Sequence, residues 1–78
     1  MTTTVTVTFK YAPQQSEETA MGDWLVPYLT AGNTTGFPLE TIGDQIFREW
    51  DTVENAQAYI VAVNEIYAKC ATSAVITA

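Results

Sequence analysis

Residues 45–70 read QIFREWDTVENAQAYIVAVNEIYAKC, and this stretch decides the fold. Its apolar residues recur at intervals of three and four, which places them on one stripe of an α-helix because 3.6 residues make a turn. Asp51 or Thr52 can accept backbone amide protons at the start of that helix, and Glu54 lies where it favours the positive end of the helix dipole. The pattern predicts a strand over 45–50, a cap, and a helix over 52–69. The expected buried stripe consists of Val53, Ala56, Ile60, Val63, Tyr67 and Cys70.

The composition is typical of one core-forming domain. The chain has 78 residues, of which 47% are hydrophobic and 12% aromatic, so disorder is not expected. A net charge of −6 repels a phosphate backbone and disfavours nucleic-acid binding. The acidic surface favours solubility, and it also allows docking to a protein partner with a basic surface.

Several classes of site are disfavoured by what the sequence lacks. The chain has no histidine, which removes imidazole catalysis and histidine-based zinc sites. Cys70 is the single cysteine, so it forms no intrachain disulfide and is expected in the core, and a cytoplasmic location fits best. No apolar run approaches the ~18 residues of a membrane span, and the first residues do not resemble a signal peptide. We expect no catalytic residue, no metal and no cofactor.

The first half of the chain predicts a strand followed by a helix. Thr4 to Tyr11 alternates threonine or lysine with valine or aromatic residues, which is typical of a strand with one buried face, and Pro13 ends it. Ser16 is the expected cap of a helix over 16–31. The apolar face of that helix holds Met21, Trp24, Leu25 and Tyr28. We expect Pro27 to kink or break the helix and Gly32-Asn33 to end it.

The middle of the chain allows two interpretations. Residues 37–42 can form an edge strand, with Gly43-Asp44 as a two-residue hairpin turn to the strand at 45–50. The apolar residues Leu39, Ile42, Ile46 and Trp50 also fit helical spacing. A helix there would have Gly43 and Asp44 in its interior, so the hairpin is preferred. A final strand is expected over 72–77.

The resulting order of elements is strand, helix, strand, strand, helix, strand. It predicts an α+β fold of the ferredoxin-like βαββαβ type, with a four-stranded antiparallel sheet, two helices on one face, and a single domain over 1–78. The threonine face of the first strand would then be the open one. A sheet with a bare face in so small a chain favours a homodimer.

Residues 46–59, which read IFREWDTVENAQAY, resemble the dimeric α+β barrel superfamily. The resemblance lies in a strand that ends in tryptophan, a small capping residue, and a helix that opens with acidic residues and alanines. It implies a homodimer whose sheets face each other. Some members are small monooxygenases or isomerases. This chain has no histidine, so the resemblance is not taken to imply one of these activities. Regulatory domains of the ACT type share the same order of elements.

Arg48 is the most informative candidate for a site, because it is the only arginine and can bind a carboxylate through two hydrogen bonds. If Phe47 points to the helices, Ile46, Arg48 and Trp50 face the open side. The opposite register places them in the core. The full set of ligand or interface candidates is Arg48, Trp50, Tyr11, Trp24 and Tyr28.

Two functions follow from these observations. The first is a small, acidic, non-enzymatic interaction protein that acts as a homodimer through protein–protein contacts. The alternative is a dimeric α+β barrel enzyme or a small-ligand-binding protein that uses the open face of the sheet.

Overall fold

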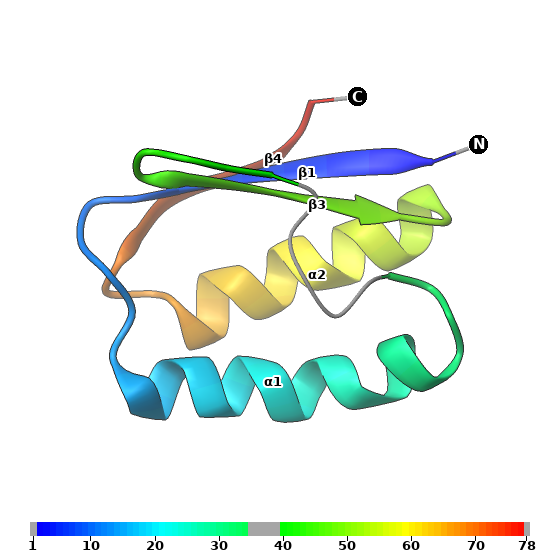
Figure 1. The fold of residues 1–78 in the computed structure, drawn as a ribbon, viewed down its shortest axis with the longest axis horizontal. Coiled ribbons are helices and arrows are strands. Elements are labelled where there is room, and N and C mark those ends of the chain that lie inside the picture. The colour runs from blue at the N-terminus through cyan, green and yellow to red at the C-terminus, as the bar shows by residue number, and fades with distance from the viewer. Residues whose placement is uncertain (1, 35–39, 78) are drawn as a thin grey trace.

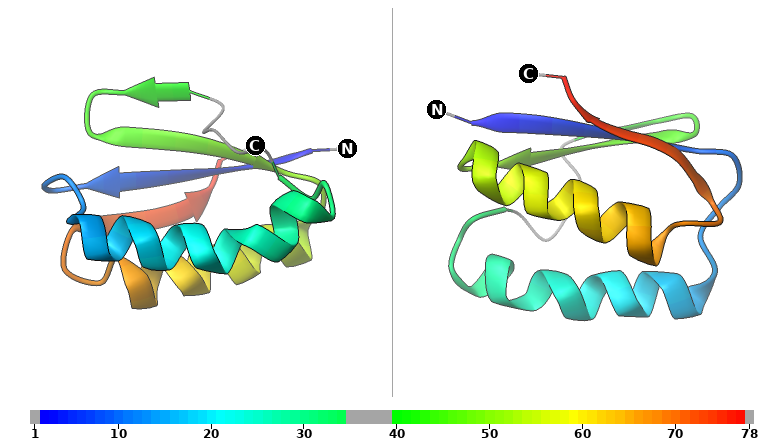
Figure 2. Two further views of the ribbon diagram at one scale, coloured as in Figure 1. Left: turned by 60° about the horizontal axis from the view of Figure 1, so that its bottom comes forward. Right: turned by 180° about the vertical axis from the view of Figure 1, so that it is seen from behind.

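The computed structural model describes residues 2–34 and 40–77 and has the α+β class expected from the sequence. Its elements are strand β1 (Thr3–Phe9), helix α1 (Gln15–Thr30), strand β2 (Glu40–Ile42), strand β3 (Gln45–Trp50), helix α2 (Val53–Ile66) and strand β4 (Ala71–Ile76). Both helices lie on the same side of the sheet (Figures 1 and 2). Neither helix of the described residues lies on the opposite side of the sheet (Figures 1 and 2). No helix in these described ranges is long and apolar enough to cross a membrane.

The strands form one antiparallel sheet in the order β2-β3-β1-β4. The central strand β1 is buried along most of its length because it has a neighbour on each side. Val5 and Val7 are fully buried and face the helices, as the period-two pattern predicts. The strand ends at Phe9, so Tyr11 does not continue it and lies half exposed. Strand β4 is an edge of the sheet, and its sequence ATSAVI contains no charged residue.

The hairpin interpretation of the middle segment is confirmed for residues 40–50. Strand β2 pairs with β3 from Glu40 opposite Phe47 to Ile42 opposite Gln45, so Gly43-Asp44 is the turn and a helix through them is wrong. Gly43 has φ +58°, which a tight hairpin turn needs and glycine adopts without a steric penalty. The part of the predicted edge strand at 37–39 lies outside the described residues.

Helix α1 differs from its prediction at its start, and it is not broken at Pro27. It begins at Gln15, and Glu17 rather than Ser16 makes a capping hydrogen bond at its N-terminus. Glu17 Oε1 accepts the backbone N–H of Gln14 at 2.9 Å. The helix also continues through Pro27 to Thr30. Pro27 is exposed, so its ring lies on the solvent side, where a distorted turn disturbs no packing. Gly32 follows the helix with φ +77°, as expected of a residue that ends a helix.

Helix α2 packs against the sheet with a stripe that is rotated from the expected one. Thr52 caps it by accepting the backbone N–H of Asn55 at 3.2 Å. Val53 is 47% exposed, so its predicted place in the core is wrong, and Tyr59 is buried instead. The helix starts at Val53, and a first-turn side chain projects back toward the helix N-terminus, away from the turns that pack on the sheet. The buried residues of this segment are Ala56, Tyr59, Ala62 and Val63 in the helix and Tyr67 and Cys70 just after it.

Candidate functional site

The register of β3 decides where the predicted site residues lie. Val5 of β1 pairs with Arg48, and Val7 pairs with Ile46. Residues directly opposite one another in an antiparallel pair project from the same face, so Ile46, Arg48 and Trp50 face the helices. The placement of Arg48 and Trp50 on the open side is therefore wrong, and the core register is the one adopted. Only 6% of Arg48 and 1% of Trp50 are exposed.

Trp50, Trp24 and Tyr28 belong to one aromatic cluster between the sheet and the helices. The ring of Trp50 lies 5.2 Å from that of Tyr59 and 5.4 Å from that of Tyr28, and Trp24 stacks on Tyr28 at 4.6 Å. These contacts fill the space between α1, α2 and β3. Three of the five predicted site residues are thus packing residues, which is the more common role of aromatic residues at helical spacing.

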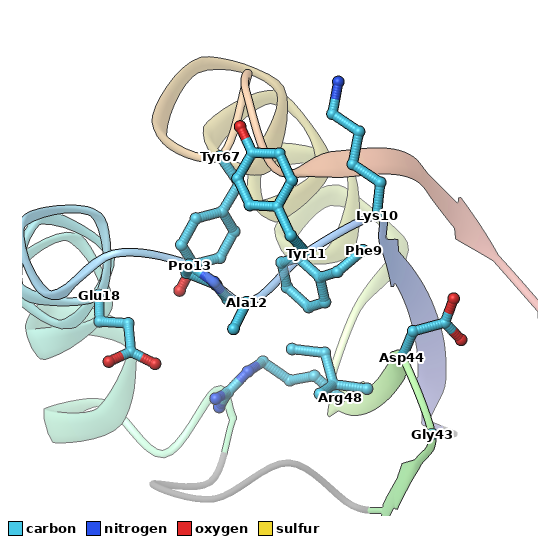
Figure 3. A pocket seen from close by; sticks show the side chains of 11 residues that line it. Phe9, Lys10, Tyr11, Ala12, Pro13, Glu18, Gly43, Asp44, Arg48 and Tyr67 are labelled. Atoms are coloured by element: carbon cyan, nitrogen blue, oxygen red, sulfur yellow. The ribbon is translucent and has the colours of Figure 1, made fainter.

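The other two predicted residues, Arg48 and Tyr11, line one cavity of about 590 Å³. It lies beside the segment that joins β1 to α1, on the helix side of the sheet (Figure 3). The structure therefore brings Arg48 and Tyr11 to one cavity, whose lining includes neither Trp24 nor Tyr28. The complete lining is Phe9, Lys10, Tyr11, Ala12, Pro13, Glu18, Gly43, Asp44, Ile46, Arg48 and Tyr67.

Arg48 is the charged group at the inner side of this cavity. Its guanidinium lies 5.8 Å from the centre of the Tyr59 ring, a cation–π distance. Burial raises the pKa of Tyr59, while the positive charge of Arg48 and its hydrogen bond to the phenol act in the opposite direction. Burial is the larger effect, so Tyr59 stays protonated and neutral beside the guanidinium.

Glu18, an acidic residue in the first turn of α1, also lines the cavity. Its carboxylate and the Arg48 guanidinium both point into the cavity, whereas Lys10 and Asp44 point away from it (Figure 3). Glu18, Met21 and Leu25 are spaced at i, i+3 and i+7, the spacing of one helix face. Met21 and Leu25 are buried on that face, so this spacing could have identified Glu18 as an inward-pointing acid.

Tyr67 completes the upper wall of the cavity. Its ring packs against Phe9 at 5.4 Å in an edge-to-face arrangement. The pKa of its phenol is raised well above the ordinary range, first by burial and then by the nearby Tyr59 and Glu18. At neutral pH the phenol is therefore a neutral hydrogen-bond donor and acceptor, not an anion.

Asp51 holds together the ends of three neighbouring elements through side-chain hydrogen bonds. Asp51 accepts hydrogen bonds from Asn33 at 2.7 Å and from Asn55 at 3.0 Å. These bonds join the end of α1, the end of β3 and the start of α2.

Cys70 is fully buried, as predicted for a core residue, and burial raises the pKa of its thiol. Within residues 2–34 and 40–77, no three acidic or cysteine side chains come together in a cluster that could hold a metal ion.

The open face of the sheet carries the alternate residues of β1, β3 and β4. Thr6 is buried there even without a covering helix, and its hydroxyl forms a hydrogen bond with that of Thr77 at 2.8 Å. Val75 is 50% exposed, and Phe47 is half-buried. The other members of this face are Thr4, Thr8, Gln45, Glu49 and Ser73.

Comparison of the chain with family models, with curated proteins and with solved structures finds no match.

Proposed function

We propose that this chain is a small non-enzymatic interaction protein that forms a homodimer through the open face of its sheet. The observation that carries the proposal is the distribution of charge. On β1, β3 and β4, Glu49 is the one charged residue of that face, and on β2 Glu40 pairs with Phe47 of the same face. The other acidic residues outside β2 lie on helices or in turns: Glu17, Glu18, Asp23, Asp44, Asp51, Glu54 and Glu65. Two copies can therefore approach through their sheets despite a net charge of −6 each.

The size of the face makes the proposed dimer a weak one. Strands β1, β3 and β4 extend about 20–24 Å and β2 about 10 Å, and four strands at about 4.8 Å spacing are about 19 Å wide. Two such faces bury on the order of 700 Å² in total, below the ~1,200 Å² of stable standard interfaces. The threonine side chains also make the contact polar. We therefore expect a dimer that depends on protein concentration and dissociates on dilution.

The same arrangement supports a ferredoxin-like assignment, which we also propose. A βαββαβ order with two helices on one face and the strand order β2-β3-β1-β4 fits a four-stranded sheet of this type. The resemblance of residues 46–59 to the dimeric α+β barrel superfamily points to the same mode of association, in which two sheets face each other.

Sedimentation velocity over a wide range of protein concentration tests this proposal. The expected result is a shift from monomer to dimer as concentration rises. Val75→Glu adds a carboxylate to the open face and should lower the dimer fraction. Val61→Glu is the matched control, because Val61 is 57% exposed on α2 and the variant has the same net charge. A monomer at every concentration, or equal effects of the two variants, would contradict the proposal.

A protein partner with a basic surface is a second candidate, favoured by the charge of the helices. Helices α1 and α2 carry five acidic residues and no basic one. A basic partner would bind this side and leave the open face available for the dimer. Co-purification from the native lysate at low and high salt tests it. A stoichiometric partner that is lost at high salt supports the idea, and the lack of any partner at low salt contradicts it.

A further inference from the structure

We propose that the cavity between the β1–α1 connection and β3 binds a small organic monocarboxylate with an apolar body. This site lies on the helix side of the sheet and is independent of the proposed dimer face. Its volume of about 590 Å³ is within the ~300–1,000 Å³ of small-molecule sites. Its lining combines aromatic and aliphatic walls with few charged groups that point inward, which is the usual character of such sites.

Arg48 supplies the group that recognises the carboxylate. Its side chain is 6% exposed and lines the cavity, so a bound anion would meet the guanidinium away from bulk water. A guanidinium has five N–H donors in a planar fork, and it can hold a carboxylate in addition to its other partners. Hydrogen bonds of this charged kind are about twice as strong as neutral ones.

The walls next to Arg48 indicate an apolar body for the ligand. Phe9 and Tyr67 form an aromatic pair on one side, and Ile46 precedes Arg48 on the same face of β3. Tyr11 is 50% exposed and lines the same cavity, so the part of a bound ligand beside it would stay in contact with solvent. A ring or short aliphatic chain that fills this space would bury apolar area on both the ligand and the protein.

Glu18 limits the ligand to a single negative charge. It is an exposed acidic residue of α1 whose carboxylate points into the cavity (Figure 3). Lys10 points away and does not offset it. A second carboxylate on the ligand would add negative charge to a cavity that already holds the Glu18 carboxylate, and it would be repelled with the reduced strength of a solvent-exposed pair.

Three probes with one hydrocarbon body test these two features on the unmodified protein. The probes are 3-phenylpropanoate, its neutral amide 3-phenylpropanamide, and the dicarboxylate 3-(4-carboxyphenyl)propanoate. Titrations are followed by the backbone amide signals of ¹⁵N-labelled protein. We expect the monocarboxylate to bind about tenfold or more tightly than the amide, and about fivefold more tightly than the dicarboxylate. The shifted signals should be those of residues that line the cavity.

Two charge-neutralising variants complete the test. Glu18→Gln should raise the affinity for the dicarboxylate to about that for the monocarboxylate, which should itself change little. Glu54→Gln removes the same charge at an exposed position at the start of α2 and should leave the ratio unchanged. Equal binding of acid and amide, or no shift at the cavity signals, would overturn the site. An equal response of the two variants would overturn the role of Glu18. Neither result depends on whether the protein is a dimer.

Discussion

Replacement of Trp50 by phenylalanine should cost much less stability than a fully buried tryptophan would suggest. Trp50 is 1% exposed, yet its indole Nε1 has no hydrogen-bond partner among the described residues. A buried N–H donor without an acceptor costs about 1–3 kcal/mol. Trp50→Phe removes that donor together with part of the apolar surface, so the two effects oppose each other.

The size of the net effect follows from the packing. An aromatic side chain of this kind buries about 150–250 Å². If about 40 Å² of apolar area is lost, the transfer term is ~1 kcal/mol at ~25 cal/mol per Å². The void left among Trp24, Tyr28 and Tyr59 adds about 1 kcal/mol. The loss of about 2 kcal/mol is offset by the removed donor, and the net change in the free energy of unfolding should lie within about 1 kcal/mol of zero.

Urea unfolding followed by far-ultraviolet circular dichroism measures this change, with Tyr59→Phe as the comparison. Tyr59 has nearly the same burial, but its hydroxyl interacts with Arg48, so its loss should cost about 1–3 kcal/mol. Trp50→Phe should therefore be the milder variant. A cost above about 3 kcal/mol for Trp50→Phe would refute the reasoning, because it would mean that the indole N–H contributes a stabilising contact.

Three further predictions concern the start of α2 and the thiol of Cys70. Thr52→Ala removes the side-chain acceptor for the backbone N–H of Asn55 and should lower the free energy of unfolding by about 1 kcal/mol in urea titrations, whereas Thr52→Ser should restore most of it. The side-chain hydrogen bonds from Asn55 and then Asn33 lower the pKa of Asp51, so its contribution to stability is present above about pH 4 and is lost as pH falls further; the slope of thermal stability between about pH 4 and pH 2 should be smaller in Asp51→Asn. Burial and then the charge of Glu17 raise the pKa of Cys70, so a thiol reagent at neutral pH should modify the folded protein far more slowly than the urea-unfolded protein, and equal rates would contradict the buried placement.

The strands and helices were largely predictable because their patterns are local. The alternation of threonine and valine gives the buried face of β1 directly, and the turn at Gly43-Asp44 follows from glycine's tolerance of positive φ. Helix α1 shows where local rules fail. Pro27 normally interrupts a helix, but at an exposed position near the C-terminal end its cost is small enough for the helix to continue to Thr30.

The candidate site was less predictable because it depends on register and on contacts between distant segments. A shift of one residue in β3 reverses the faces of Arg48 and Trp50, and the pairing with β1 that sets this register is not visible in the local sequence. The helical spacing of Glu18 with Met21 is visible in the sequence. The sequence does not show that Glu18 lines the same cavity as Arg48, because this depends on how α1 packs beside the sheet.

The uncharged edge strand β4 has a consequence for handling the protein in solution. A strand edge with open backbone groups can recruit another strand, and many proteins protect such edges with lysine or proline. In β4 neither residue is present, and Val75 and Ile76 are 50% and 40% exposed. Repulsion between copies with a net charge of −6 opposes this recruitment at neutral pH. Near the isoelectric point of about 4.1 that repulsion disappears, so mildly acidic buffers are the conditions under which the protein would precipitate or form fibrils.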